Sequence, residues 1–199
     1  AQLLTVFANV GALFFIPIYL RQAGGFSSLQ AGMALLPDSI VGMLAAPFVG
    51  RLIRNRGHRQ VLLAGLAIGA AGLALLGLAI GVSYLAIVVP LMMIGLSFAL
   101  VNTGANDLVL TNASEDRVGA ATGIAETSFE LGNALGIAIV GSLVSMIYLI
   151  VTGDRGDLSA AVDGRGFTIA MTGTALICAA LMAAATAVVA RALRTPAAD

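Results

Sequence analysis

Six long apolar stretches dominate the sequence and limit what the chain can fold into. Each is close to the roughly 20 helical residues that cross a bilayer core of about 30 Å, and turn residues or charges separate them. The expected spans are 1–20, 29–53, 60–81, 85–112, 118–150 and 167–190. We therefore expect an all-α membrane protein in which residues 1–199 form one bundle of six transmembrane helices.

The composition agrees with a membrane protein. The chain is 59% hydrophobic and 10% charged, and its mean hydropathy is +1.02, which leaves too little polar surface for a soluble globule of this length. Its 10 basic and 10 acidic residues balance, so we expect no nucleic-acid partner. The only cysteine, Cys178, excludes an internal disulfide and a cysteine-based metal cluster.

The arginines are unevenly divided between the two ends of the expected spans. One end carries Arg51, Arg54, Arg56, Arg59, Arg117, Arg191 and Arg194, and the other carries Arg21, Arg155 and Arg165. Because basic residues accumulate on the cytoplasmic side, we expect a multi-pass protein of the plasma membrane with both termini in the cytoplasm. Tyr19, Tyr84 and Tyr148 then fall at the outer boundary, where tyrosine is favoured.

Three acidic residues are expected deep in the bilayer. At 1.5 Å per residue, Glu126 and Glu130 lie roughly 12 and 18 Å from the inner boundary, and Asp38 lies roughly 14 Å from the outer one. A carboxylate at that depth is costly unless it meets water, a partner or a cation, so such residues are functional candidates. The alternative is that they pair with bases on a missing partner or fix the packing of helices.

Glu126 and Glu130 are four residues apart and therefore share one helix face. Two carboxyl groups so close in a medium of low dielectric constant oppose each other's ionisation. The pair can thus exchange a proton for a lipophilic cation. Asp107, near the inner end of its span, is a further candidate for substrate or proton binding, although solvation at a cavity mouth explains it equally.

Asn9, Asn102 and Asn106 are the candidate cavity-lining residues, since polar residues recur at helical spacing in these two spans. Hydrogen bonding between helices is the open alternative. The spans contain no serine–histidine or histidine–glutamate arrangement suited to hydrolysis, so we do not expect an enzyme.

Three stretches resemble the fourteen-span drug:proton antiporters of the major facilitator superfamily, in their C-terminal six spans. The first runs from Pro17 to Arg21 and from Ser27 to Pro37. The second resembles the superfamily's cytoplasmic loop motif and includes Gly50, Arg51, Leu52, Gly57 and Arg59. Arg54 replaces the aspartate of that motif, so the charge-relay role of the aspartate does not carry over.

The third stretch, residues 123–136, is most similar to the exporters of quaternary ammonium compounds and cationic dyes. It carries Glu126 and Glu130, followed by Leu-Gly-Asn. The resemblance implies that both acids attract cationic substrates or protons. Those exporters also carry an aspartate in the second span of this half; the aligned position is Gly42, and Asp38 lies one helical turn away.

The resemblance implies two inverted three-helix repeats and a central cavity lined by the first and fourth spans. It also implies proton-coupled efflux of lipophilic cationic drugs across a bacterial plasma membrane, driven by the proton gradient without a cofactor or metal. The expected partners are the bilayer, small lipophilic cations and an N-terminal half of the same transporter. The alternatives are a six-span interaction module that is inactive alone and an exporter of a lipid or another metabolite.

Overall fold

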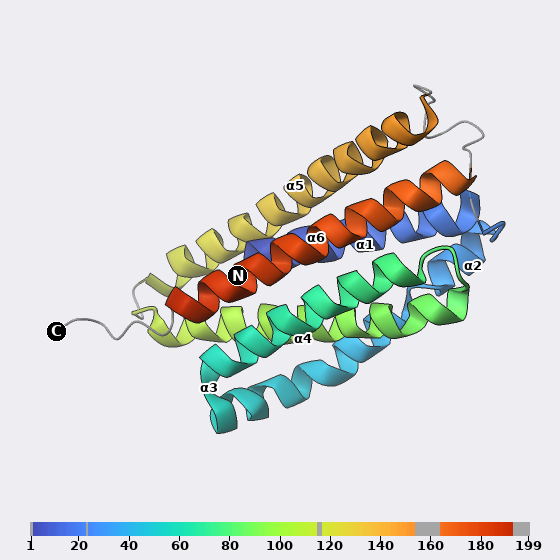
Figure 1. Ribbon diagram of the computed structural model, residues 1–199. Helices are drawn as coiled ribbons and strands as arrows, with labels where there is room; N and C mark the ends of the chain where they lie inside the picture. Colours follow the sequence, from blue (N-terminus) through green and yellow to red (C-terminus); the bar gives the residue numbers. More distant parts are fainter. Residues whose placement is uncertain (1, 23, 115–116, 154–163, 193–199) are drawn as a thin grey trace.

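The computed structural model describes residues 2–22, 24–114, 117–153 and 164–192, which are helical apart from short connections. The helices are α1 (Gln2–Gln22), α2 (Ser28–Met33), α3 (Leu36–Ala79), α4 (Tyr84–Asn112), α5 (Val118–Thr152) and α6 (Gly164–Ala192). The long helices lie side by side along a common direction (Figure 1). The expected all-α class is confirmed for this part of the chain. Arg155 and Arg194 of the charge argument lie outside it.

Helix α3 contains 44 residues and folds back on itself. A straight helix of this length would measure about 66 Å, twice the thickness of a bilayer core. The reversal is at Gly57, whose φ of 78° and ψ of 156° are non-helical and open to glycine because it has no Cβ. Figure 1 shows the two arms, residues 36–56 and 58–79, running in opposite directions.

The helix in the region of the span expected at 29–53 is interrupted near its beginning. The short helix α2 ends at Met33, and α3 begins only at Leu36. Pro37 explains the break because its nitrogen has no hydrogen to donate to the preceding turn. At the other end of α2, the Ser27 hydroxyl accepts the N–H of Gln30 at 3.3 Å, and the Ser27 N–H donates to the Gln30 side chain at 2.9 Å. This reciprocal cap makes a sharp start.

The helices pack most closely where α3 meets α4, with α6 against α3 and α1 against α5. The centre of the bundle is filled by fully buried apolar side chains. They include Ile16, Leu66, Leu91, Val144 and Phe167. Glycines bring the backbones together: a Cβ at Gly65 would lie 2.7 Å from Val101 Cγ2, and one at Gly72 would lie 3.1 Å from Met93 Cβ. Such close approach is typical of helix packing in membranes.

The outer surface of the bundle is apolar. In the described part of the chain, four helical stretches are long and apolar enough to cross a membrane: Ser28–Ala79, Tyr84–Asn112, Val118–Thr152 and Gly164–Arg191. Large exposed apolar side chains include Met43, Phe48, Leu85, Ile124 and Ile150. Soluble monomers rarely expose so many large apolar side chains together. The fold is therefore that of a membrane protein.

Candidate functional site

Helix α5 carries Glu126 and Glu130 on its exposed side. Glu126 and Glu130 are both exposed, whereas the buried residues of α5 begin only further along the helix, at Gly132, Gly136 and Val140. Only 22% of the most apolar 18-residue stretch of α5 is buried, against 50% of the corresponding stretch of α4. Within the described part of the chain, neither carboxylate has an ion-pair partner. The predicted acid pair thus lies on a helix face that this chain leaves uncovered.

The polar residues around the acid pair are satisfied within α5 itself. The Thr127 hydroxyl donates to the Gly123 carbonyl at 2.8 Å, and the Ser128 hydroxyl donates to the Ile124 carbonyl at 2.8 Å. Such bonds to the preceding turn hide hydroxyl groups inside an apolar helix. Glu126 and Glu130 are the groups of this segment that a ligand or a proton can still engage.

Helix α4 contacts α5 at the residue that precedes Glu130. The rings of Phe98 on α4 and Phe129 on α5 lie 6.3 Å apart between centroids. Asn102 and Asn106 follow Phe98 at intervals of four residues and therefore share its face. The Asn106 amide donates to the Asn102 carbonyl oxygen at 3.5 Å. The contact between the two rings thus lies beside Glu130 in the sequence, on the face of α4 that carries Asn102 and Asn106.

Asp38 lies apart from the pair on α5 and is 7% exposed. A Cβ built at Gly95 of α4 would lie 2.9 Å from the carbonyl carbon of Asp38 and 3.0 Å from its Cα, so the two backbones touch. Oδ1 of Asp38 has no hydrogen-bond partner among the described residues. A buried carboxylate oxygen without a partner is costly. The structure does not bring Asp38 into contact with Glu126 or Glu130.

Asn9 on α1 is 6% exposed, and its Nδ2 also has no partner among the residues described. Buried amides normally donate at least one hydrogen bond, so this group is available to a ligand or water inside the bundle. The expectation that Asn9 lines a cavity remains a prediction.

Asp107 is engaged by a residue to which the sequence assigned no role. His58 Nε2 lies 2.7 Å from Asp107 Oδ2, and both side chains are partly exposed. His58 directly follows the reversal at Gly57, so this contact ties the bend of α3 to the end of α4. The charges of His58 and Asp107 could have suggested the pair, but nothing in the sequence places a residue of the bend beside the end of α4.

The other residues of the cytoplasmic motif surround this bend. Gly50 and Arg51 lie near the end of the first arm of α3, and the Arg51 guanidinium lies 5.7 Å from the centroid of the Phe48 ring. Arg59 is exposed at the start of the second arm. In the described residues, no three of the His, Cys, Asp and Glu side chains form a group that could hold a metal ion.

The contact between His58 and Asp107 predicts energetic coupling. Replacing either residue by Ala should lower the free energy of unfolding by nearly as much as replacing both. The effects of the two single substitutions should then differ from additivity by a coupling free energy of about 0.5–1 kcal/mol, as for partly exposed pairs. Unfolding of the four proteins of this cycle by SDS in mixed micelles measures it. Additive effects of the two single substitutions would show that the contact contributes nothing.

Comparison with known proteins identifies the family. Residues 1–137 match the model of the Major Facilitator Superfamily. The chain is 30% identical over 145 residues to the tetracenomycin C resistance and export protein of Streptomyces glaucescens, covering 72% of this chain and 27% of that protein. It is 28% identical over 149 residues to the multidrug efflux pump LfrA of Mycolicibacterium smegmatis, covering 74% and 30%.

A third relative, the multidrug resistance protein Stp of Mycobacterium tuberculosis, is 30% identical over 146 residues, covering 73% of this chain and 27% of that protein. The chain thus spans less than a third of the length of these relatives. The family consists of transporters, so the expectation that the chain is not an enzyme is confirmed. On the evidence of its helical fold, its apolar surface and these matches, the chain belongs to the major facilitator superfamily.

Proposed function

We propose that this chain is the C-terminal six-span half of a multidrug antiporter that exports lipophilic cations from bacteria in exchange for protons. The observation that supports it is the position of Glu126 and Glu130, in the first half of α5 on a face that the chain leaves uncovered. Carboxylates in that position require water, a cation or a proton. The relatives add weight, because their names describe drug export and resistance.

In this proposal the six spans are α1, the two arms of α3 with α2 preceding the first, α4, α5 and α6. The helix contacts are compatible with two inverted repeats of three spans. The first helix of each repeat packs against the other repeat, since α1 contacts α5 and α4 contacts α3. Both termini then lie on the cytoplasmic side of the plasma membrane, together with the bend at Gly57.

In this proposal the uncovered face of α5 is covered by the N-terminal half of the same transporter. The side chains of Glu126 and Glu130 and the exposed Asn106 would face the N-terminal half of the transporter, with the cavity between the halves. Rocking of one six-span bundle against the other is how transporters of this architecture expose such a cavity to either side. No cofactor is needed, because the proton gradient drives the cycle.

The cycle follows from competition for the same carboxylates. A lipophilic cation enters from the cytoplasm or the membrane and is held by Glu126 and Glu130. Protons that enter from outside neutralise these groups and release the cation. Linkage makes the effect reciprocal, since a bound cation lowers the proton affinity by the same factor. Asp38 is a further proton-binding residue in this scheme, because a proton would remove the cost of its unpartnered charge.

Dye efflux tests this function. Cells that make the transporter containing these spans should accumulate several-fold less ethidium than cells without it, and a protonophore should abolish the difference because it collapses the driving force. The six-span chain produced alone is the control and should not export ethidium. Efflux that survives the protonophore would contradict proton coupling, and equal export of an anionic dye would contradict the choice of cargo.

A further inference from the structure

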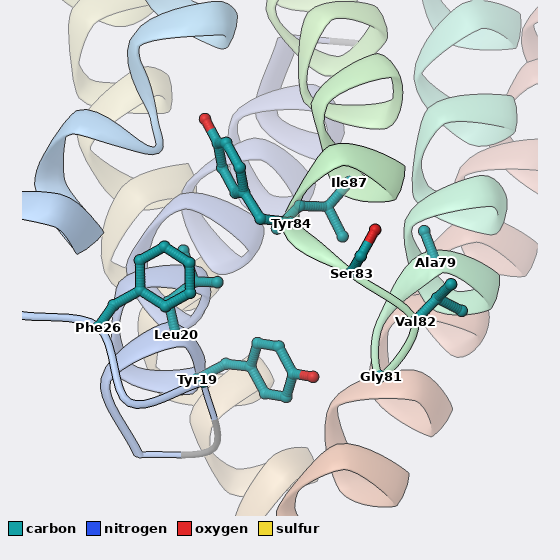
Figure 2. Close-up of a pocket in the computed structure, with 10 residues that line it drawn as sticks. Tyr19, Leu20, Phe26, Ala79, Gly81, Val82, Ser83, Tyr84 and Ile87 are labelled. Atoms are coloured by element: carbon teal, nitrogen blue, oxygen red, sulfur yellow. The ribbon is translucent and has the colours of Figure 1, made fainter.

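A pocket of about 220 Å³ lies at the end of the bundle where α1 finishes and α4 begins. Tyr19 comes from the last turns of α1, Phe26 from the connection to α2, and Tyr84 from the first turn of α4. Figure 2 shows these three side chains and Leu20 on one side of the space, with the turn formed by Gly81, Val82 and Ser83 on the other. All of the wall is provided by this chain.

The aromatic rings are held in place by their neighbours. The Tyr19 ring stacks on Phe167 of α6 with centroids 6.3 Å apart and an interplanar angle of 19°. The Phe26 and Tyr84 rings lie 6.0 Å apart at 51°. The Phe26 N–H donates to the Leu20 carbonyl at 3.0 Å, which closes the loop that carries Phe26. The pocket is therefore preformed by contacts between four elements.

The chemistry of the wall favours a cation. None of the ten described residues that form the pocket carries a charge at neutral pH. The Ser83 hydroxyl is occupied, since it accepts the Ala86 N–H at 3.3 Å as the cap of α4. Three aromatic rings also line the pocket, those of Tyr19, Phe26 and Tyr84, and the faces of such rings are electron-rich and attract ammonium groups.

The size of the pocket limits the ligand to a head group. Pockets that enclose a whole drug-sized molecule measure about 300–1,000 Å³, and this one is smaller. A quaternary ammonium with short substituents is of suitable size, while the rest of a larger cation would extend through the opening. In the proposed orientation, that opening is on the outer side of the membrane.

We propose that Tyr19, Phe26 and Tyr84 form a second cation site that holds the ammonium group of the exported compound on the outer side before release. This inference rests on the proposed function for the identity of the cargo. The site is distinct from the carboxylates, because it recognises the cation through aromatic rings and contains no carboxyl group. It therefore binds cations whether or not the glutamates are protonated.

Protection of an introduced cysteine tests the site without reference to transport. Val82 is 72% exposed at the pocket, and Val82→Cys provides a thiol that a maleimide labels in the full-length transporter in nanodiscs. Cys178 is buried and is replaced by Ala together with any other cysteine. Phenyltrimethylammonium should slow the labelling in a saturable way, and its neutral isostere tert-butylbenzene at equal concentration should not.

Loss of one ring should weaken the protection. Tyr19→Leu and Phe26→Leu should each raise the half-protecting concentration of phenyltrimethylammonium roughly five- to tenfold, the range of one partly desolvated cation–π contact. Tyr19→Phe keeps the ring and should change the half-protecting concentration less than twofold. Phe48→Leu removes an exposed ring outside the pocket, on the first arm of α3. As a control, it should leave the half-protecting concentration unchanged.

Three outcomes would overturn the proposal: no protection by phenyltrimethylammonium, equal protection by tert-butylbenzene, or protection that survives both ring deletions. The second outcome would show an apolar pocket for a neutral group or an acyl chain. The double variant Glu126→Gln/Glu130→Gln separates this inference from the proposed function, since it should abolish dye efflux and keep the protection. Efflux without protection would leave the antiporter intact and remove only the second site.

Discussion

Replacing Glu126 and Glu130 together by Gln should abolish proton-driven efflux of a lipophilic cationic dye, and each single substitution should reduce it by roughly 10- to 100-fold. The estimate follows from the loss of one charge-assisted contact, about 1.5–3 kcal/mol. Glutamine keeps the size of the side chain but cannot be ionised, so both the attraction for the cation and the exchange of the proton are lost. Initial rates of ethidium efflux in energised cells measure the effect.

Thr127→Val is the matched control for these substitutions. Thr127 lies between the two acids, and its hydroxyl bonds only to the preceding turn of α5. Valine has nearly the same shape, so efflux should stay within about twofold of the unmodified transporter, because no charge is lost. Proton-driven efflux at the normal rate in both Gln variants would refute the role of the acid pair.

Substitution of Gly95 by Ala should cause a large loss of stability. A Cβ there would collide with the backbone of Asp38, and backbone atoms cannot rotate away as a flexible side chain can. The first arm of α3 would have to move away from α4, at a cost of about 1–3 kcal/mol or more. This exceeds the gain of about 1 kcal/mol that Ala brings to a helix interior. Thermal unfolding in detergent, followed by the loss of monomer in gel filtration, measures it.

Gly123→Ala provides the matched comparison, because a Cβ at Gly123 meets nothing within 4 Å. Only the helix propensity changes at that site, so the variant should be as stable as the original or more so. If Gly95→Ala unfolds at the same temperature as Gly123→Ala, the close contact between α3 and α4 is not required for folding. Gly95→Leu should then be tested as the more severe case.

The apolar stretches predicted the positions of several helices closely. The span expected at 118–150 is α5 at Val118–Thr152, and the one expected at 85–112 is α4 at Tyr84–Asn112. Length and hydropathy suffice here because a helix in lipid must satisfy all its backbone hydrogen bonds internally. The interruption before Leu36 was not predicted, since Pro37 within an apolar run does not alter the hydropathy on which the span rests.

The arrangement of the acids could be predicted only in part. Helical spacing correctly placed Glu126 and Glu130 on one face of α5, but it could not tell that this face is exposed while Asp38 is buried. In a membrane protein both the lipid-facing and the protein-facing sides of a helix are apolar, so the pattern carries little information about which side is covered. The backbone contact between Gly95 and Asp38 requires knowing which helices are neighbours.

The bend at Gly57 has a mechanical consequence for the two arms of α3. Because a single non-helical residue joins the two arms, the connection between them is too short to lengthen. Neither arm can slide along its axis without pulling the other, and His58 anchors the same corner to α4 through Asp107. We therefore expect an axial displacement of either arm to reach the other arm and the end of α4 at this corner of the bundle.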